Sequence, residues 1–196
     1  MTLKSQIRIS LLRLFDIFFS SISLLTLFPV FLTISLFVLF DGFPIIYTSN
    51  RVGKNGITFK MYKFRSMKVD KSNRLKDLDR LNKLGIFLRR TSLDELPQLI
   101  NVLLGHMSLV GPRSLPITIE KKIPKKYIKF RRSINPGITG LSQINYSGKN
   151  RSLREKINLD IQYVKNISIF NYFKILFMTF FVIIKRYKNN IKGLSL

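Results

Sequence analysis

The sequence predicts an α/β fold that is mainly α: an N-terminal helix-break-helix hairpin in the membrane, a small domain with short strands, and amphipathic helices at the membrane interface. Three observations predict it. Residues 17–40 form a run of 24 residues without a charge, long enough to cross a bilayer. Short β-branched and aromatic segments follow, between segments of helical periodicity. With 34 basic and 10 acidic residues, the chain suits an anionic partner such as a membrane surface.

The hairpin is predicted within residues 1–41. Pro29 lies near the middle of the apolar run, where it removes a backbone donor and kinks a helix. Both flanks are basic, so the positive-inside tendency would place both in the cytoplasm. We therefore expect a re-entrant hairpin that bends at Pro29, with a single spanning helix as the alternative. Hydroxyls that could bond to carbonyls freed at the break are Ser20, Ser21, Ser23 and Thr26.

The small domain is predicted over residues 42–166. Residues 43–47 and 57–62 have the composition of strands, with a turn at 53–56 between them. Leucines at threefold spacing predict an amphipathic helix over 71–88. Ser92 and Glu95 have the spacing of a capping box, which predicts a helix from Ser92 to Gly105. Residues 136–140 are expected to be a loop and 152–164 a helix.

Residues 167–196 are predicted to be an amphipathic helix over 167–184 followed by a basic tail. This helix is expected to lie in the membrane interface, with spanning as the alternative. The basic segment 121–132 is a solvated face or a contact for anionic headgroups.

Composition excludes several kinds of site. There is no cysteine, so disulfides and thiolate metal sites are excluded, and the single His106 excludes any site that needs two histidines. Nucleic acid is not an expected partner, because no nucleic-acid motif is present and the apolar run argues against one. A non-enzymatic basic protein that binds anionic lipid at the membrane surface remains the alternative to an enzyme.

Asp94 and Glu95 are the strongest candidates for chemistry. Their simplest role is helix capping, since carboxylates favour the positive end of the helix dipole. However, Arg89 and Arg90 lie one turn away, and helix N-termini attract phosphate. We expect a carboxylate there to stay ionised at neutral pH, which suits a nucleophile or a metal ligand rather than a general acid.

Three more basic residues are candidates for binding phosphate. Arg113 lies in a Gly-Pro-Arg segment, and its guanidinium matches phosphate oxygens in a way that lysine does not. Lys63 and Arg65 alternate along a predicted strand and could point the same way. The alternatives are a solvated loop arginine and edge-strand charges that discourage aggregation.

Taken together, these segments resemble the bacterial sugar transferase family, the monotopic polyprenyl-phosphate phosphoglycosyl transferases, and most closely its small PglC-like members. The resemblance runs from about residue 12 to residue 186. The segments that carry it are Arg13-Leu14-Phe15-Asp16, Pro29, Tyr62-Lys63-Phe64-Arg65-Ser66-Met67, Thr91-Ser92-Leu93-Asp94-Glu95-Leu96-Pro97-Gln98, Met107-Ser108-Leu109-Val110-Gly111-Pro112-Arg113, Pro136-Gly137-Ile138-Thr139-Gly140, Asp160, Tyr163-Val164 and Asn166.

The resemblance implies transfer of a sugar-1-phosphate from a UDP-sugar to undecaprenyl phosphate, with UMP released. The first step would form a phosphosugar–aspartyl intermediate on Asp94, beside Mg²⁺ held with Asp94. Glu95 would position metal or substrate, Arg89 and Arg113 would grip phosphates, and Asp160 would support the site. Gln143 and Thr139 belong to matched segments and are also expected to support it.

The resemblance also implies a re-entrant helix in the cytoplasmic leaflet of the bacterial inner membrane, with the catalytic core facing the cytoplasm. The product would start a lipid-linked glycan of a capsule, exopolysaccharide, O-antigen or glycoprotein. The sequence departs from the family pattern at several positions, and either Lys149 or Arg151 would replace a family arginine. The other departures are Phe28, His106, Ser114, Asn135 and Leu141.

Overall fold

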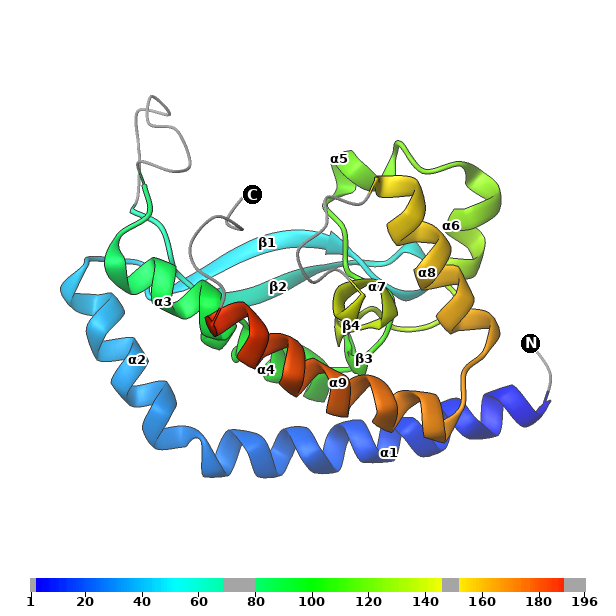
Figure 1. Ribbon diagram of the computed structural model, residues 1–196, viewed down its shortest axis with the longest axis horizontal. Coiled ribbons are helices and arrows are strands. Elements are labelled where there is room, and N and C mark those ends of the chain that lie inside the picture. Colours follow the sequence, from blue (N-terminus) through cyan, green and yellow to red (C-terminus); the bar gives the residue numbers. More distant parts are fainter. Residues whose placement is uncertain (1–2, 69–79, 146–151, 189–196) are drawn as a thin grey trace.

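Two helices that meet at an open bend run along the outside of a small α/β domain in the computed structural model, which describes residues 3–68, 80–145 and 152–188 (Figure 1). We call these two helices the hairpin, after the predicted element. The hairpin consists of α1 (Leu3–Thr26) and α2 (Phe28–Phe40). Two small sheets form the centre of the domain. One pairs β1 (Ile46–Val52) with β2 (Thr58–Phe64) antiparallel, and the other pairs β3 (Ser108–Val110) with β4 (Gly137–Thr139) in parallel.

Helices surround these sheets, so the predicted α/β class with mainly α content is confirmed. A 3₁₀ turn, η1 (Lys54–Gly56), joins β1 to β2. The remaining elements are α3 (Lys83–Thr91), η2 (Leu93–Glu95), α4 (Gln98–Leu103), α5 (Ile117–Glu120), α6 (Lys125–Arg131), α7 (Leu141–Ile144), α8 (Leu153–Lys165) and α9 (Ile169–Lys188).

The hairpin breaks at Leu27, two residues before the predicted bend at Pro29. Pro29 lies in the first turn of α2, where a missing N–H leaves no helical bond unmade. Thr26 Oγ1 donates at 2.9 Å to the carbonyl of Ile22, which lies inside α1 and is not one of the carbonyls freed at the break. The helix-break-helix form is therefore confirmed. By length and composition, Gln6–Thr26 could cross a membrane, while α2 is shorter.

Polar side chains attach α1 to the domain. Arg13 donates to the carbonyls of Leu103 at 3.1 Å and Met107 at 3.3 Å. Asp16 is 2% exposed, and its Oδ1 accepts the N–H of Leu109 at 2.9 Å and the hydroxyl of Tyr172. Asp16 thus ties α1, β3 and α9 together through one carboxylate.

Arg65 attaches the other end of the hairpin to the same domain. Its Nη2 donates to the carbonyls of Val38 at 2.9 Å and Gly42 at 2.6 Å, and its Nε donates to Pro44 at 2.9 Å. Val38 and Ile34 of α2 also pack with Phe64 and Leu88 of the domain. Both ends of the hairpin are therefore held on one body.

Four predicted elements differ from the structure. The helix predicted from Ser92 to Gly105 is instead the 3₁₀ turn η2 followed by the short helix α4, which begins at Gln98. Strand β1 begins at Ile46 and extends to Val52, beyond the predicted 43–47. Helix α3 begins only at Lys83, because Asn82 caps it by accepting the N–H of Gly85 at 2.7 Å. The helix predicted over 71–88 is therefore wrong at residues 80–82. Residues 71–79 lie outside the described residues. The predicted loop at 136–140 contains strand β4.

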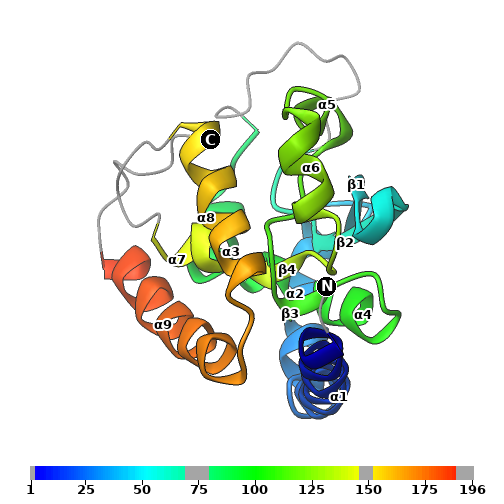
Figure 2. The same ribbon diagram turned by 90° about the vertical axis from the view of Figure 1, so that its right-hand side faces the viewer.

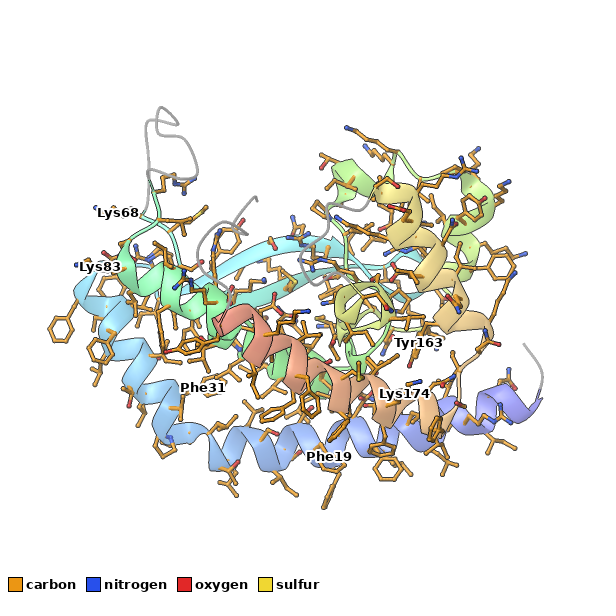
Figure 3. The ribbon with its side chains drawn as sticks, viewed as in Figure 1. Phe19, Phe31, Lys68, Lys83, Tyr163 and Lys174 are labelled. Atoms are coloured by element: carbon orange, nitrogen blue, oxygen red, sulfur yellow. The ribbon has the colours of Figure 1, made fainter. Side chains whose placement is uncertain are left out.

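The apolar side chains of α1 and α9 are widely exposed. Figure 3 shows side chains along the outer edge of α1, around Phe19, that project away from the domain. On α9, Phe170, Phe177 and Phe180 are exposed while Tyr172 and Ile175 are buried, so α9 is amphipathic as predicted. The basic segment 121–132, by contrast, includes α6, which lies on the side of the molecule opposite α1 (Figures 1 and 2).

Tyr172→Phe removes one hydrogen bond to the buried Asp16 carboxylate and leaves the rest of the ring in place. We expect it to lower the free energy of unfolding by about 1–3 kcal/mol, as for a buried hydrogen bond to a charged group. Denaturant unfolding measures this. Tyr187→Phe is the matched control on α9, because Tyr187 is 58% exposed; equal stability of the two variants would contradict the assignment.

Candidate active site

A left-handed residue places the two carboxylates. Helix α3 ends at Thr91, and Ser92 follows with φ 58°, so the chain turns sharply into η2. Ser92 makes no side-chain cap bond, which makes the predicted capping box wrong. The box fails because a capping residue needs extended backbone, whereas Ser92 is left-handed. After this turn, Asp94 and Glu95 both lie near Lys63 of strand β2.

Lys63 of β2 lies between the two carboxylates. Its Nζ is 2.6 Å from Glu95 Oε1 and 3.7 Å from Asp94 Oδ2. Asp94 is 6% exposed, so it is the more deeply buried of the pair's two acids. One lysine therefore balances two adjacent negative charges at a partly closed site.

Burial raises the pKa of Asp94 to about 6. Lys63 and Arg89 lower this pKa and Glu95 raises it, but desolvation has the largest effect. At neutral pH the carboxylate is mostly ionised, as expected from the sequence. A helix N-terminus alone would lower the pKa of Asp94, so the observed rise is in the opposite direction.

Basic residues gather at an open cavity beside these carboxylates, and Glu95 is the acid that lines it. Lys63, Glu95, Arg113 and Gln143 line it, together with a residue that the sequence did not single out, Arg51 of β1. Burial lowers the pKa of Arg51, and the nearby charge of Arg113 lowers it further, so the two guanidinium groups lie close together. The remaining lining residues are Met61, Gln98, Ser114, Gly137 and Ile138.

Arg89 stands near Asp94, on the last turn of α3. Its Nε donates to Ser66 Oγ at 2.9 Å, and its charge lowers the pKa of Asp94. Arg65 is placed differently: its guanidinium is 7% exposed and bonds to the carbonyls at the end of α2. Lys63 contacts the two acids, whereas Arg65 contacts the carbonyls at the end of α2. This corrects the expectation that the two side chains point the same way.

The predicted supporting residues occupy separate positions. Gln143 lines the cavity, and its Nε2 donates to the carbonyl of Ile138 at 2.7 Å. Thr139 is buried, with its hydroxyl 2.7 Å from that of Thr179 on α9. Asp160 is 2% exposed behind the cavity, 3.1 Å from Arg131 Nε. Lys149 and Arg151 lie outside the described residues.

Two departures from the family pattern lie together at the end of α4, away from the residues that line the cavity. Asn135 Nδ2 donates to the carbonyl of Gly105 at 3.0 Å. The ring of His106 stacks on Phe59, with centroids 5.6 Å apart. Both side chains therefore support the turn that leads from α4 into β3.

The acidic donors that a divalent ion would need are few. Within the described ranges, no three His, Asp or Glu side chains gather into a metal-binding group. Asp94 and Glu95 are nevertheless adjacent, and both lie near Lys63; Glu95 lines the cavity, and Asp94 is buried beside it. This set fits Mg²⁺, which takes one or two protein carboxylates and completes its octahedron with water and substrate phosphates.

The buried charge of Asp94 makes a prediction about stability. Because its folded pKa is raised from 3.8 to about 6, its stabilising contribution is complete below pH 4 and is lost as pH rises through 6. Asp94→Asn avoids that loss. We expect the variant to be more stable than the wild type at pH 7, by up to about 3 kcal/mol at 1.4 kcal/mol per pKa unit.

Thermal or denaturant unfolding at pH 4 and pH 7 checks this, and the gain should vanish at pH 4. An Asn variant that is less stable than the wild type at pH 7 would contradict the raised pKa.

Comparison with known proteins agrees with the motifs. The chain is 39% identical over 185 residues to an exopolysaccharide production protein of Rhizobium leguminosarum bv. phaseoli, covering 85% of this chain and 92% of that protein. It is 39% identical over 179 residues to the UDP-glucose:undecaprenyl-phosphate glucose-1-phosphate transferase of Escherichia coli K12, covering 85% of this chain and 38% of that protein.

A third relative is the undecaprenyl-phosphate galactose phosphotransferase of Salmonella typhimurium, 38% identical over 195 residues, with 89% of this chain and 40% of that protein covered. The chain thus spans about two fifths of the length of the two enterobacterial relatives. The model of the bacterial sugar transferase family matches residues 7–186. The chain belongs to the bacterial sugar transferase family.

Proposed function

We propose that the protein transfers a sugar-1-phosphate from a UDP-sugar to undecaprenyl phosphate and so starts a lipid-linked glycan. The observation that supports this most is Asp94, a buried carboxylate 3.7 Å from Lys63, which itself lines a cavity together with Arg51 and Arg113. The names of two relatives state this kind of reaction, with glucose and galactose as the sugars. Membership of the same family makes the same chemistry the best-supported one here.

The reaction proceeds in two displacements at phosphorus. An oxygen of the Asp94 carboxylate attacks the β-phosphorus of the UDP-sugar, the bond to the bridging oxygen breaks, and UMP leaves with that oxygen. The sugar phosphate is then an acyl phosphate on Asp94. An oxygen of undecaprenyl phosphate attacks the same phosphorus, which frees the Asp94 carboxylate and leaves the sugar linked to the lipid by a pyrophosphate.

Charge neutralisation is the main task of the protein, because both substrates and the nucleophile are anionic. Lys63 balances Asp94 and Glu95 before substrate arrives. Arg113 and Arg51 line the cavity where the diphosphate would lie, and Arg89 adds positive charge next to Asp94. Arg65 has no part in this proposal, since its donors hold the end of α2.

Asp94 and Glu95 are the residues that would hold Mg²⁺. When bound, the ion supplies positive charge to phosphate oxygens and to the departing UMP. Lys63 lies 2.6 Å from Glu95, so it carries the balancing charge between these carboxylates in the structure described here.

The hairpin would lie in one leaflet, with the domain in the cytoplasm. Arg13 holds α1 to the domain, and Arg65 holds the end of α2 to that same domain. A segment whose two ends are bound to one body on one side of a bilayer must enter and return. We therefore favour the re-entrant form, with residues 1–41 as anchor, 42–166 as catalytic core and 167–196 as an interfacial segment at the inner membrane.

Nucleotide release tests the proposed reaction. Detergent-purified protein is incubated with Mg²⁺, undecaprenyl phosphate and a panel of UDP-sugars that includes UDP-glucose and UDP-galactose. We expect the wild type to release UMP from one of them, and Asp94→Asn to release at least about 10³-fold less, because the nucleophile is gone. Omission of Mg²⁺ should also abolish release.

Release of UDP would instead indicate a conventional glycosyltransferase. If no sugar of the panel gave turnover while membrane binding persisted, the chain would be a non-enzymatic basic membrane protein.

Cysteine labelling tests the topology, because the natural chain has no cysteine. Gln6→Cys and Lys54→Cys place exposed thiols near the N-terminal end of α1 and beyond the end of α2. In intact spheroplasts, a membrane-impermeant maleimide should label neither variant, and lysis should expose both. Labelling of only one of them in intact cells would establish a spanning helix.

A further inference from the structure

Arg113 contributes its guanidinium to the proposed phosphate site from the segment after β3, where it is exposed between the buried residues Pro112 and Ser114. An exposed arginine normally samples many conformations, and fixing it is entropically unfavourable. Some part of the protein must therefore hold the backbone that carries this side chain.

A buried ion pair lies directly behind that backbone. Arg131 of α6 is 6% exposed and Asp160 of α8 is 2% exposed. Arg131 Nε is 3.1 Å from Asp160 Oδ2, while Arg131 Nη2 donates to the carbonyl of Arg113 at 2.6 Å. Burial raises the pKa of Asp160, and the charge of Arg131 lowers it. The pair thus contacts the backbone of Arg113 at its carbonyl.

The opposite side of this segment is held by β4. Arg113 forms an isolated bridge with Gly137, whose N–H donates to the carbonyl of Pro112 at 2.9 Å. A Cβ on Gly137 would lie 2.0 Å from the nitrogen of Gly111, so only glycine permits this approach. The backbone at Arg113 is therefore confined between β4 and the ion pair.

We propose that Arg131 and Asp160 are positioning residues for phosphate recognition: the pair fixes the Arg113 backbone so that its guanidinium meets the diphosphate of the donor. This inference rests on the proposed function. Neither residue touches substrate. Without Asp160, the Arg131 charge would be buried and unpaired, so it would move toward solvent and release the Arg113 carbonyl.

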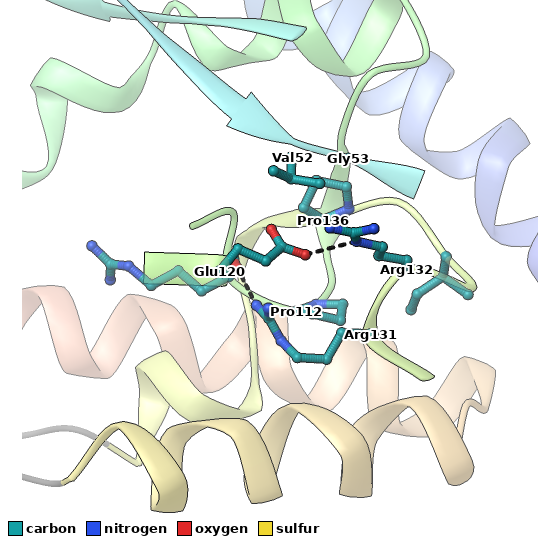
Figure 4. Close-up of a pocket in the computed structure, with 9 residues that line it drawn as sticks. Val52, Gly53, Pro112, Glu120, Arg131, Arg132 and Pro136 are labelled. Atoms are coloured by element: carbon teal, nitrogen blue, oxygen red, sulfur yellow. Dashed lines mark hydrogen bonds and ion pairs between the residues drawn. The ribbon is translucent and has the colours of Figure 1, made fainter. Parts of the chain in front are cut away.

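A neighbouring ion pair supplies a matched control. Glu120 is 3% exposed, and its Oε1 is 2.9 Å from Arg132 Nε. Figure 4 shows Glu120, Arg131 and Arg132 around one small cavity, with Arg132 paired to Glu120. The two pairs come from adjacent residues of α6 and its end, yet only Arg131 donates to Arg113.

The test is a double-mutant cycle on the affinity for UDP, the diphosphate that all candidate donors share. Calorimetry with Mg²⁺ measures Kd for purified wild type, Asp160→Asn, Arg113→Ala and the double variant. We expect each single change to weaken UDP binding about 10-fold, as for a hydrogen bond to a charged group. In the Arg113→Ala background, Asp160→Asn should add less than about 2-fold, because it acts only through Arg113.

Glu120→Gln should lower stability but change the UDP Kd by less than about 2-fold. Should Asp160→Asn fail to fold, Arg131→Lys replaces it in the cycle: its ammonium keeps a charge beside Asp160 but lacks the second nitrogen that reaches Arg113.

The inference would be overturned if Asp160→Asn weakened UDP binding equally in the wild type and in Arg113→Ala. It would also be overturned if Glu120→Gln weakened UDP binding as much as Asp160→Asn does, or if Arg113→Ala left the UDP Kd unchanged. A wild type that does not bind UDP at all would overturn the proposed function, and the inference with it.

Discussion

The rest of the site depends on keeping Asp94 charged while it is buried. A carboxylate that is 6% exposed loses most of its hydration, and the protein must replace that hydration with fixed positive charge. Lys63 and Arg89 supply it, but not completely, because burial still raises the pKa of Asp94 to about 6. The ionised Asp94 carboxylate is therefore less stable in the folded protein than in water. This is consistent with a nucleophile that becomes more stable once it is bonded to phosphorus.

The same few residues connect this chemistry to the membrane hairpin. Strand β2 carries Lys63 to the carboxylates, and two residues later Arg65 holds the end of α2. Leu88 of α3, one residue before Arg89, packs with Val38 of α2. Asp94, the proposed nucleophile, is therefore fixed relative to the hairpin by strand and helix rather than by a flexible linker. This arrangement suits the proposed reaction, in which one substrate is soluble and the other is held in a bilayer.

Local sequence signals located the centre of the site but not its surroundings. Asp94, Glu95 and Arg113 were recognisable because each lies in a short motif. Gln143 was recognisable because it belongs to a segment that matches the family pattern. Arg51 and Arg131 were missed, since nothing in their own neighbourhoods indicates that β1 and α6 meet Arg113. The false capping box at Ser92 shows the reverse problem: the spacing was right, but a left-handed turn set by the fold overrode it. A true box does occur at Ser152 and Glu155.

The central claim is that Asp94 forms a covalent bond to phosphorus, and intact-protein mass spectrometry tests it most directly. Wild-type protein is mixed with its UDP-sugar and Mg²⁺ in the absence of undecaprenyl phosphate, then denatured and weighed. Our account predicts an added mass equal to one sugar phosphate, on the peptide that contains Asp94, and none on Asp94→Asn. An enzyme that releases UMP when undecaprenyl phosphate is added, but forms no adduct on any peptide without it, would contradict the claim, because the transfer would then occur directly between the two substrates.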